Sequence, residues 1–149
     1  MESSGQARVL VVAHRTAATP ALLHAVKERA ARGPARFTLL VPNPARGLHR
    51  AVDPEDQDRS EAEATLALAL PLLEEAAGSP VEGMVGDANP LDAVQDAVNL
   101  HGFDEIIVST LPKRVSHWLH MDLPAKLNGL GLPVTTVTAK GPERTPAPA

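Results

Sequence analysis

The chain has 149 residues, of which 44% are hydrophobic and 2% aromatic, and its net charge is −4. This length is typical of one domain, with a core of Val, Leu, Ile and Ala. The absence of cysteine excludes disulfides, thiolate catalysis and cysteine-ligated zinc, and the acidic balance argues against a nucleic-acid partner. No apolar run approaches the roughly 20 residues of a membrane span, and residues 1–6 lack a signal-peptide core. We therefore expect a soluble cytoplasmic protein.

Short apolar, β-branched runs alternate with longer amphipathic segments along the chain. The runs predict strands buried on both faces, and the segments between them predict helices. The expected strands are residues 8–13, 37–41, 81–85, 103–108 and 134–139. The expected helices are residues 20–32, 60–77, 90–101 and 123–128.

Polar residues that can cap a helix precede each predicted helix. They are Thr19, Ser60, Asn89 and Asp122, and Ser60 with Glu63 matches a capping box. Pro20 and Pro90 suit the first helical position, and Gly102 suits a helix end. Pro71 lies inside the second helix and should kink it.

A long polar segment, 45–58, separates the second strand from the second helix, and loops of this length are often functional or mobile. Its acidic residues Asp53, Glu55, Asp56 and Asp58 resemble a weak cation site, but the pattern of a calcium-binding EF-hand is absent. A flexible acidic loop is the interpretation we favour. His117 and His120 share a helix face without a third ligand nearby, so no metal is expected.

The βαβαβαβαβ order predicts a single α/β domain, residues 8–139, with an open parallel sheet and helices on both faces. We expect residues 1–7 to be flexible and the Pro-rich tail 140–149 to be disordered. Ligands of such sheets bind beyond the carboxyl ends of the strands, where the strand order reverses. Candidate ligand-binding residues at these ends are His14, Arg15, Thr16, Val41, Gly86, Asp87, Ser109 and Thr110.

Each candidate also has a plainer interpretation. The turn 14–16 could simply be a polar connection, and Ser109 and Thr110 could satisfy local backbone groups. A basic cluster follows the fourth strand and could bind an anion such as phosphate. Its basic residues are Lys113, Arg114, His117 and His120, with Ser116 among them, and Arg15 is expected nearby. A solvated surface paired with Asp122 is the commoner explanation of such a cluster. For Trp118, core packing is more common than a role in covering a ligand or anchoring a partner.

Several segments in this order resemble the universal stress protein family over residues 8–139. The turn Gly86-Asp87-Ala88-Asn89-Pro90 looks like the family's glycine-containing turn. The run Phe103-Asp104-Glu105-Ile106-Ile107-Val108 is similar to its fourth strand, and Gly131-Leu132-Pro133-Val134 to its final strand. The resemblance implies strand order 3-2-1-4-5 and a homodimer that pairs through the fifth strand. In one branch of the family it also implies ATP bound between strands one and four.

The chain departs from that ATP-binding pattern. The family's acidic residue after strand one falls near His14, and its G-x-x-G loop falls on Thr110-Leu111-Pro112-Lys113, which has no glycine. Glycines let backbone N–H groups approach phosphates closely, whereas Pro112 has no N–H to offer. The later Gly-Ser falls near Met121-Asp122, where a carboxylate would repel phosphate. We therefore do not expect ATP in the family's usual mode.

Three functions stay open. The first is a non-enzymatic stress or regulatory module, homodimeric and without a cofactor. The second is a sensor that binds a nucleotide or phosphate through the basic cluster, with ATP or another adenine nucleotide as the ligand. The third is a weak nucleotide hydrolase, for which the fold alone is poor evidence.

Overall fold

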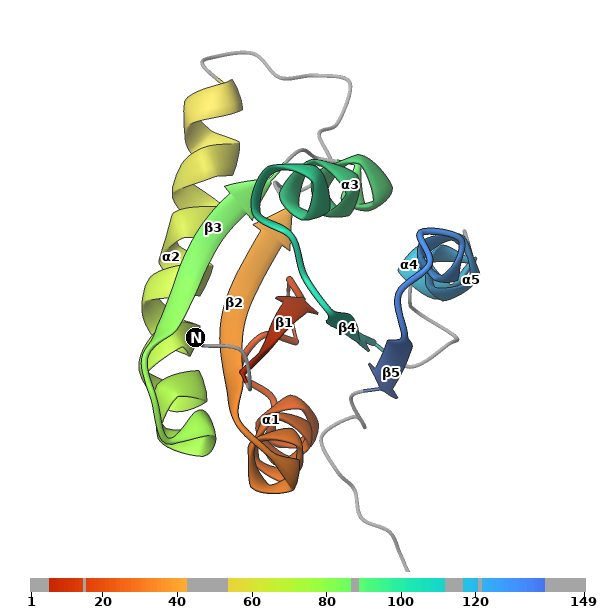
Figure 1. Ribbon diagram of the computed structural model, residues 1–149. Helices are drawn as coiled ribbons and strands as arrows, with labels where there is room; N and C mark the ends of the chain where they lie inside the picture. The colour runs from red at the N-terminus through yellow and green to blue at the C-terminus, as the bar shows by residue number, and fades with distance from the viewer. Residues whose placement is uncertain are drawn as a thin grey trace, which may run out of the picture.

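The computed structural model describes residues 6–14, 16–42, 54–86, 89–111, 117–120 and 122–138, without the side chains of 54–60, 117 and 120. Within these residues, five strands form one parallel sheet in the order β3-β2-β1-β4-β5 (Figure 1), as predicted. The strands are β1 (Ala7–Val12), β2 (Ala35–Pro42), β3 (Val81–Gly86), β4 (Glu105–Thr110) and β5 (Val134–Thr138). The helices are α1 (Pro20–Arg32), α2 (Pro54–Ala77), α3 (Pro90–His101), α4 (His117–His120) and α5 (Leu123–Asn128).

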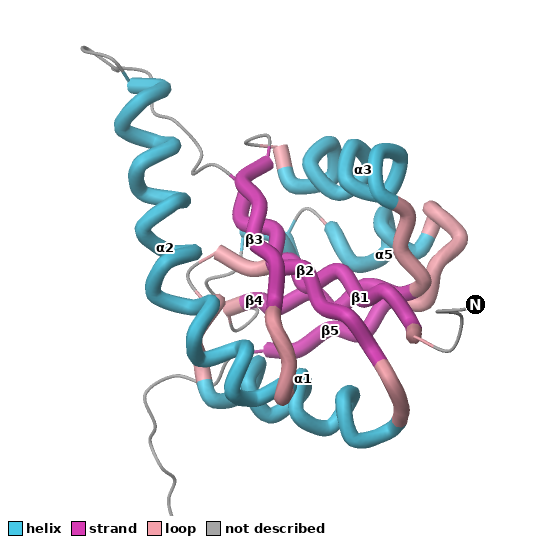
Figure 2. The backbone as a smooth tube through the Cα atoms, turned by 60° about the vertical axis from the view of Figure 1, so that its left-hand side comes forward, coloured by secondary structure: helices cyan, strands magenta, loops and turns pink. Residues whose placement is uncertain are grey.

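The sheet is covered on both faces (Figure 2), and β1 at its centre shows why. Side chains alternate between the faces of a strand. Val9 and Val11 belong to the core cluster under α1 and α2, whereas Leu10 and Val12 belong to the cluster under α3 and α5. All four are at most 1% exposed. The apolar run of β1 therefore has no polar face, as expected of a strand buried on both sides.

At two of the four predicted helix starts, the predicted capping residue occupies the N-cap position. Asn89 caps α3, because its Oδ1 accepts hydrogen bonds from the backbone N–H groups of Leu91 at 2.9 Å and Asp92 at 3.2 Å. Thr19 occupies the N-cap position of α1, but its hydroxyl donates to the backbone oxygen of Thr16 at 3.0 Å instead of capping the helix. The cap at Asn89 contributes about 1 kcal/mol to the stability of α3.

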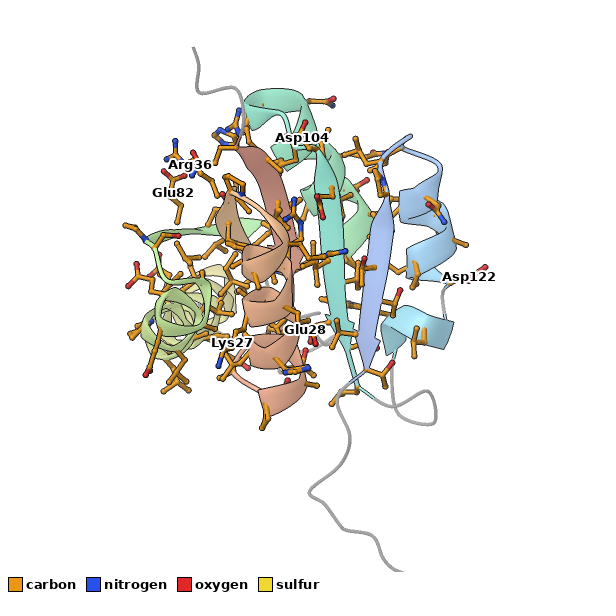
Figure 3. The ribbon with its side chains drawn as sticks, turned by 60° about the horizontal axis from the view of Figure 1, so that its bottom comes forward. Lys27, Glu28, Arg36, Glu82, Asp104 and Asp122 are labelled. Carbon is orange, nitrogen blue, oxygen red and sulfur yellow. The ribbon has the colours of Figure 1, made fainter. Side chains whose placement is uncertain are left out.

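The other two predicted starts are wrong. Helix α2 begins at Pro54, so Ser60 lies inside the helix and the polar segment 45–58 is helical from residue 54 onward. Proline at the first helical position is itself a start signal, and here it outweighs the capping box. Asp122 makes no capping hydrogen bond, because its backbone is left-handed (φ 61°, ψ 39°) and an N-cap needs an extended backbone. Its side chain points away from the domain (Figure 3).

A partly buried ion pair joins α1 to the start of β4. The Arg29 guanidinium donates from Nε to both carboxylate oxygens of Glu105, at 3.0 and 3.1 Å, and from Nη2 to Oε2 at 2.8 Å. The two side chains are 12% and 25% exposed. The hydrogen bond to Glu105 raises the pKa of Arg29 against the opposing effect of burial. This two-pronged geometry is stronger than a single surface contact.

We expect Glu105→Ala to lower the free energy of unfolding by about 1.5–3 kcal/mol, because it leaves the charge of Arg29 partly buried and unpaired. Urea denaturation checks this. The matched control is Glu82→Ala, which breaks the exposed pair between Arg36 Nη2 and Glu82 Oε2 at 3.6 Å (Figure 3) and should cost at most about 1 kcal/mol. If both variants lost the same free energy of unfolding, the Arg29–Glu105 pair would contribute no more to stability than an exposed ion pair.

Candidate functional site

The candidate site lies where β1 and β4 end side by side. These neighbours pair in parallel, with Val9 to Val12 opposite Glu105 to Val108. The chain runs from β1 to β2 on one side and returns to β4 on the other, so the strand order reverses here. Three buried polar side chains of the described residues lie at this point. They are Thr16 (2% exposed), Ser109 (1%) and Thr110 (2%).

Thr16 and Ser109 satisfy each other. Their hydroxyl oxygens lie 2.6 Å apart, and either hydroxyl can donate. Ser109 follows the alternation of Ile107, so it faces α1 and α2. Thr16 belongs to the turn between β1 and α1, which brings it over the end of β4. The pair closes the loop onto the sheet without leaving a buried polar group unpaired.

Thr110 is in the opposite situation. It lies on the other face of β4, with Val108, and its buried Oγ1 has no hydrogen-bond partner in the described part of the chain. A buried hydroxyl without a partner costs about 1–3 kcal/mol, and native proteins carry few of them. The Thr110 hydroxyl lies where the strand order reverses, which is where sheets of this kind bind ligands. It is therefore suited to form a hydrogen bond with a polar group of a ligand.

Two of the predicted binding residues have packing roles. Val41 is fully buried in the cluster under α1 and α2. Gly86 is the last residue of β3 and not part of a turn. A Cβ atom at Gly86 would lie 2.7 Å from the Ala93 Cβ and 2.8 Å from the Leu40 Cδ1. The absence of a side chain at Gly86 therefore lets α3 pack closely on the sheet.

The remaining predicted residues divide into two groups. His14 is half-buried directly beyond β1, as predicted. Trp118 is half-buried and packs on the cluster under α3 and α5, which confirms core packing. The others lie outside the described residues or, for the last two, have no described side chain: Arg15, Asp87, Lys113, Arg114, Ser116, His117 and His120.

No group of three or more His, Asp or Glu side chains is arranged to hold a metal ion among the residues that the structure describes. None of the helices described is long and apolar enough to cross a membrane.

The sequence alone left Ser109 and Thr110 undecided between ligand and backbone, and it missed the bond from Ser109 to Thr16. The available signal was topological. Strands one and four are neighbours in the predicted order, so polar residues that end them must meet. The sequence could not show which of the two adjacent hydroxyls, Ser109 or Thr110, forms a hydrogen bond within the protein.

The chain matches no protein-family model and no curated protein, but it is similar to solved structures. A universal stress protein from Archaeoglobus fulgidus is 18% identical with a TM-score of 0.63, covering 88% of this chain and 93% of its own. A universal stress protein in complex with cAMP is 18% identical with a TM-score of 0.61, covering 93% and 100%. An Arabidopsis thaliana family member with AMP bound is 14% identical with a TM-score of 0.55, covering 91% and 93%. The chain therefore has the universal stress protein fold.

We expect Ser109→Ala to lower the free energy of unfolding by about 1–3 kcal/mol, because it leaves the Thr16 hydroxyl buried without a partner. The double variant Thr16→Val/Ser109→Ala removes both hydroxyls and should be more stable than Ser109→Ala. A double-mutant cycle measured by urea denaturation checks this. Losses that simply add would show that the two hydroxyls do not depend on each other.

Proposed function

We propose that the protein is a non-enzymatic regulatory module that binds a nucleoside monophosphate at the carboxyl ends of β1 and β4. The observation that carries the proposal is the buried Thr110 hydroxyl, which has no hydrogen-bond partner among the residues that the structure describes. The fold supports it, since proteins of this fold have been solved with cAMP and with AMP. A ligand hydroxyl or phosphate oxygen that bonds Thr110 would remove the cost of the orphaned group.

A monophosphate fits the sequence better than ATP does. The segment Thr110-Leu111-Pro112-Lys113 has no glycine, so its backbone is poorly suited to enclose a chain of phosphates. Lys113 and Arg114 follow within four residues of Thr110 in the sequence, and they carry enough positive charge for one phosphate group. The proposed module binds its ligand without turning it over, and a cytoplasmic location remains a prediction of the sequence.

The competing proposal is a regulatory module that needs no nucleotide. The Thr16–Ser109 bond favours it, because that bond satisfies two of the three buried hydroxyls internally. The two proposals make opposite predictions for added nucleotide, so one titration separates them. Hydrolysis of a nucleotide has less support, since the fold by itself is poor evidence for catalytic activity.

We expect AMP or cAMP to raise the melting temperature, with ATP no better than AMP. A ligand at about a hundred times its Kd adds about 2.7 kcal/mol of stability, so a thermal-shift titration with inorganic phosphate as a further ligand can detect it. Thr110→Val should weaken nucleotide binding about tenfold, which corresponds to about 1.4 kcal/mol. Without ligand, the same variant should be as stable as the parent or more so, because it removes an unpaired buried hydroxyl.

Two results would contradict the proposal. A melting temperature unchanged by every nucleotide would favour the nucleotide-independent module. Nucleotide binding that is unaffected by Thr110→Val would place the ligand elsewhere. Lys113→Ala/Arg114→Ala then tests the basic cluster separately, because loss of binding in that variant alone would assign the phosphate to those charges.

We further propose that the module is a homodimer that pairs through β5. The two edges of the sheet differ. At β3, the Val81 N–H donates to the Glu74 carboxylate of α2 at 3.1 Å, so a helix side chain occupies the first edge donor. At β5, the strand pairs with β4 alone within the described residues. An edge strand with free N–H and C=O groups is suited to pair with a second strand.

Thr136 is the residue with which to test this edge. Ile106 donates its N–H to the Pro133 oxygen, so Pro133 and Thr135 point their backbone groups toward β4. The backbone groups of Thr136 therefore point outward, since directions alternate along a strand. Proline has no N–H but is tolerated on an edge strand. Thr136→Pro thus removes one outward donor without breaking the β4–β5 ladder.

We expect light scattering to give about twice the 15.7 kDa chain mass for the parent protein and the single-chain mass for Thr136→Pro. The matched control is Thr135→Pro, which removes a donor that points toward β4 and should destabilise the fold itself. A monomeric parent protein would contradict the dimer. A Thr136→Pro variant that remains dimeric would show that the contact between copies lies elsewhere.

A further inference from the structure

Helix α2 carries an apolar stripe on its outer side as well as on its inner side. On the inner side, Leu66, Leu70 and Leu73 pack on the core cluster under α1 and α2, as predicted. On the outer side, Leu68 is 68% exposed and Leu72 is 39% exposed. Residues four apart on a helix are neighbours, so these two leucines form one surface. The exposed residues of this stripe are Ala64, Ala67, Leu68, Pro71 and Leu72.

Nothing within the described structure covers this stripe. Helix α2 is the outermost element beside β3, and no other described helix or strand lies on its outer side (Figures 1 and 2). An amphipathic surface helix normally presents polar side chains there. Exposed leucines that lie together on a helix are typical of interaction sites.

The charge of α2 indicates what kind of partner would fit. Its sequence holds seven acidic residues and one basic residue, a net charge of −6 on a helix of 24 residues. The whole chain has a net charge of −4, so the remainder of the chain carries +2. The exposed residues Glu61 and Glu75 lie seven positions before and after Leu68, on its side of the helix. The leucine surface is therefore flanked by negative charge at both ends.

We propose that the outer side of α2 is a docking surface for a basic amphipathic helix of a partner protein. Apolar side chains of that helix would cover Leu68 and Leu72, and its Lys or Arg residues would pair with the flanking glutamates. This surface is separate from the nucleotide site and from the β5 edge, so the proposal does not rest on either of them.

The same charges argue against two other occupants of this surface, namely a second copy of the chain and an anionic membrane. In an antiparallel pair of α2 helices centred on Leu68, Glu61 of one copy would face Glu75 of the other. A parallel pair would align each glutamate with its own copy. Both arrangements place like charges together. The negative surface of an anionic membrane would repel the helix for the same reason.

The test uses a fluorescent 14-residue Leu/Lys amphipathic peptide as the probe, with fluorescence anisotropy as the measurement. We expect the parent protein to bind it and Leu68→Gln/Leu72→Gln to bind about tenfold more weakly. The matched control is Leu100→Gln, which changes a leucine of α3 that is 75% exposed and should leave the affinity unchanged. Glu61→Gln/Glu75→Gln should weaken binding and reduce its salt dependence, because pairs of exposed charges are screened by salt.

Three outcomes would overturn the proposal. The first is no binding of the peptide, or equal binding of a version with Glu in place of Lys. The second is an equal loss of affinity in Leu100→Gln, which would mean that any exposed leucine suffices. The third is a dimer that becomes monomeric in Leu68→Gln/Leu72→Gln by light scattering, which would make the stripe an interface between copies. Circular dichroism of each variant verifies that the changes at these exposed positions leave the fold intact.

Discussion

The burial of β1 on both faces is the constraint on which the rest of the structure depends. Val9 to Val12 are at most 1% exposed, so helices must cover the sheet on either side. Each helix that connects two parallel strands returns the chain to the end of the sheet where the strands begin. The right-handed sense of these crossovers determines on which face each helix lies. In the observed strand order β1 pairs with β4 in parallel, so the carboxyl ends of these two strands lie side by side. The candidate site is thus a consequence of the strand order within a sheet that is covered on both faces.

Small residues make that burial possible with few aromatic side chains. At Gly86, a methyl group would lie within 2.8 Å of both Ala93 and Leu40, so β3 and α3 approach as closely as the backbone allows. At Gly83, a Cβ would lie 2.9 Å from a methyl carbon of Leu66 on α2. A core of Val, Leu and Ala fills its volume by such close approach. A glycine that the sequence suggests as a ligand-binding residue can therefore be a packing residue in the fold.

Adjacent residues at the end of β4 have opposite environments because a strand alternates its faces. Ser109 faces the loop that follows β1 and bonds Thr16, whereas Thr110 faces the other way and has no partner among the described residues. The two edges of the sheet differ for a comparable reason. Helix α2 lies along β3 and Glu74 occupies an edge donor there, while β5 pairs with β4 alone among the described residues. The proposed ligand site and the proposed dimer contact both follow from these asymmetries.

The sequence by itself determined the five strands, their order through the resemblance to a known family, and the cap at Asn89. Apolar runs and local capping patterns are short-range signals, and a single chain carries them openly. Tertiary structure decided the rest. It holds Asp122 in a left-handed backbone, and it buries Val41 in the core cluster under α1 and α2. It also pairs Ser109 with Thr16 across 93 positions and leaves Thr110 without a partner in the part of the chain that the structure describes, because the partner of a side chain depends on residues that only the folded chain brings near.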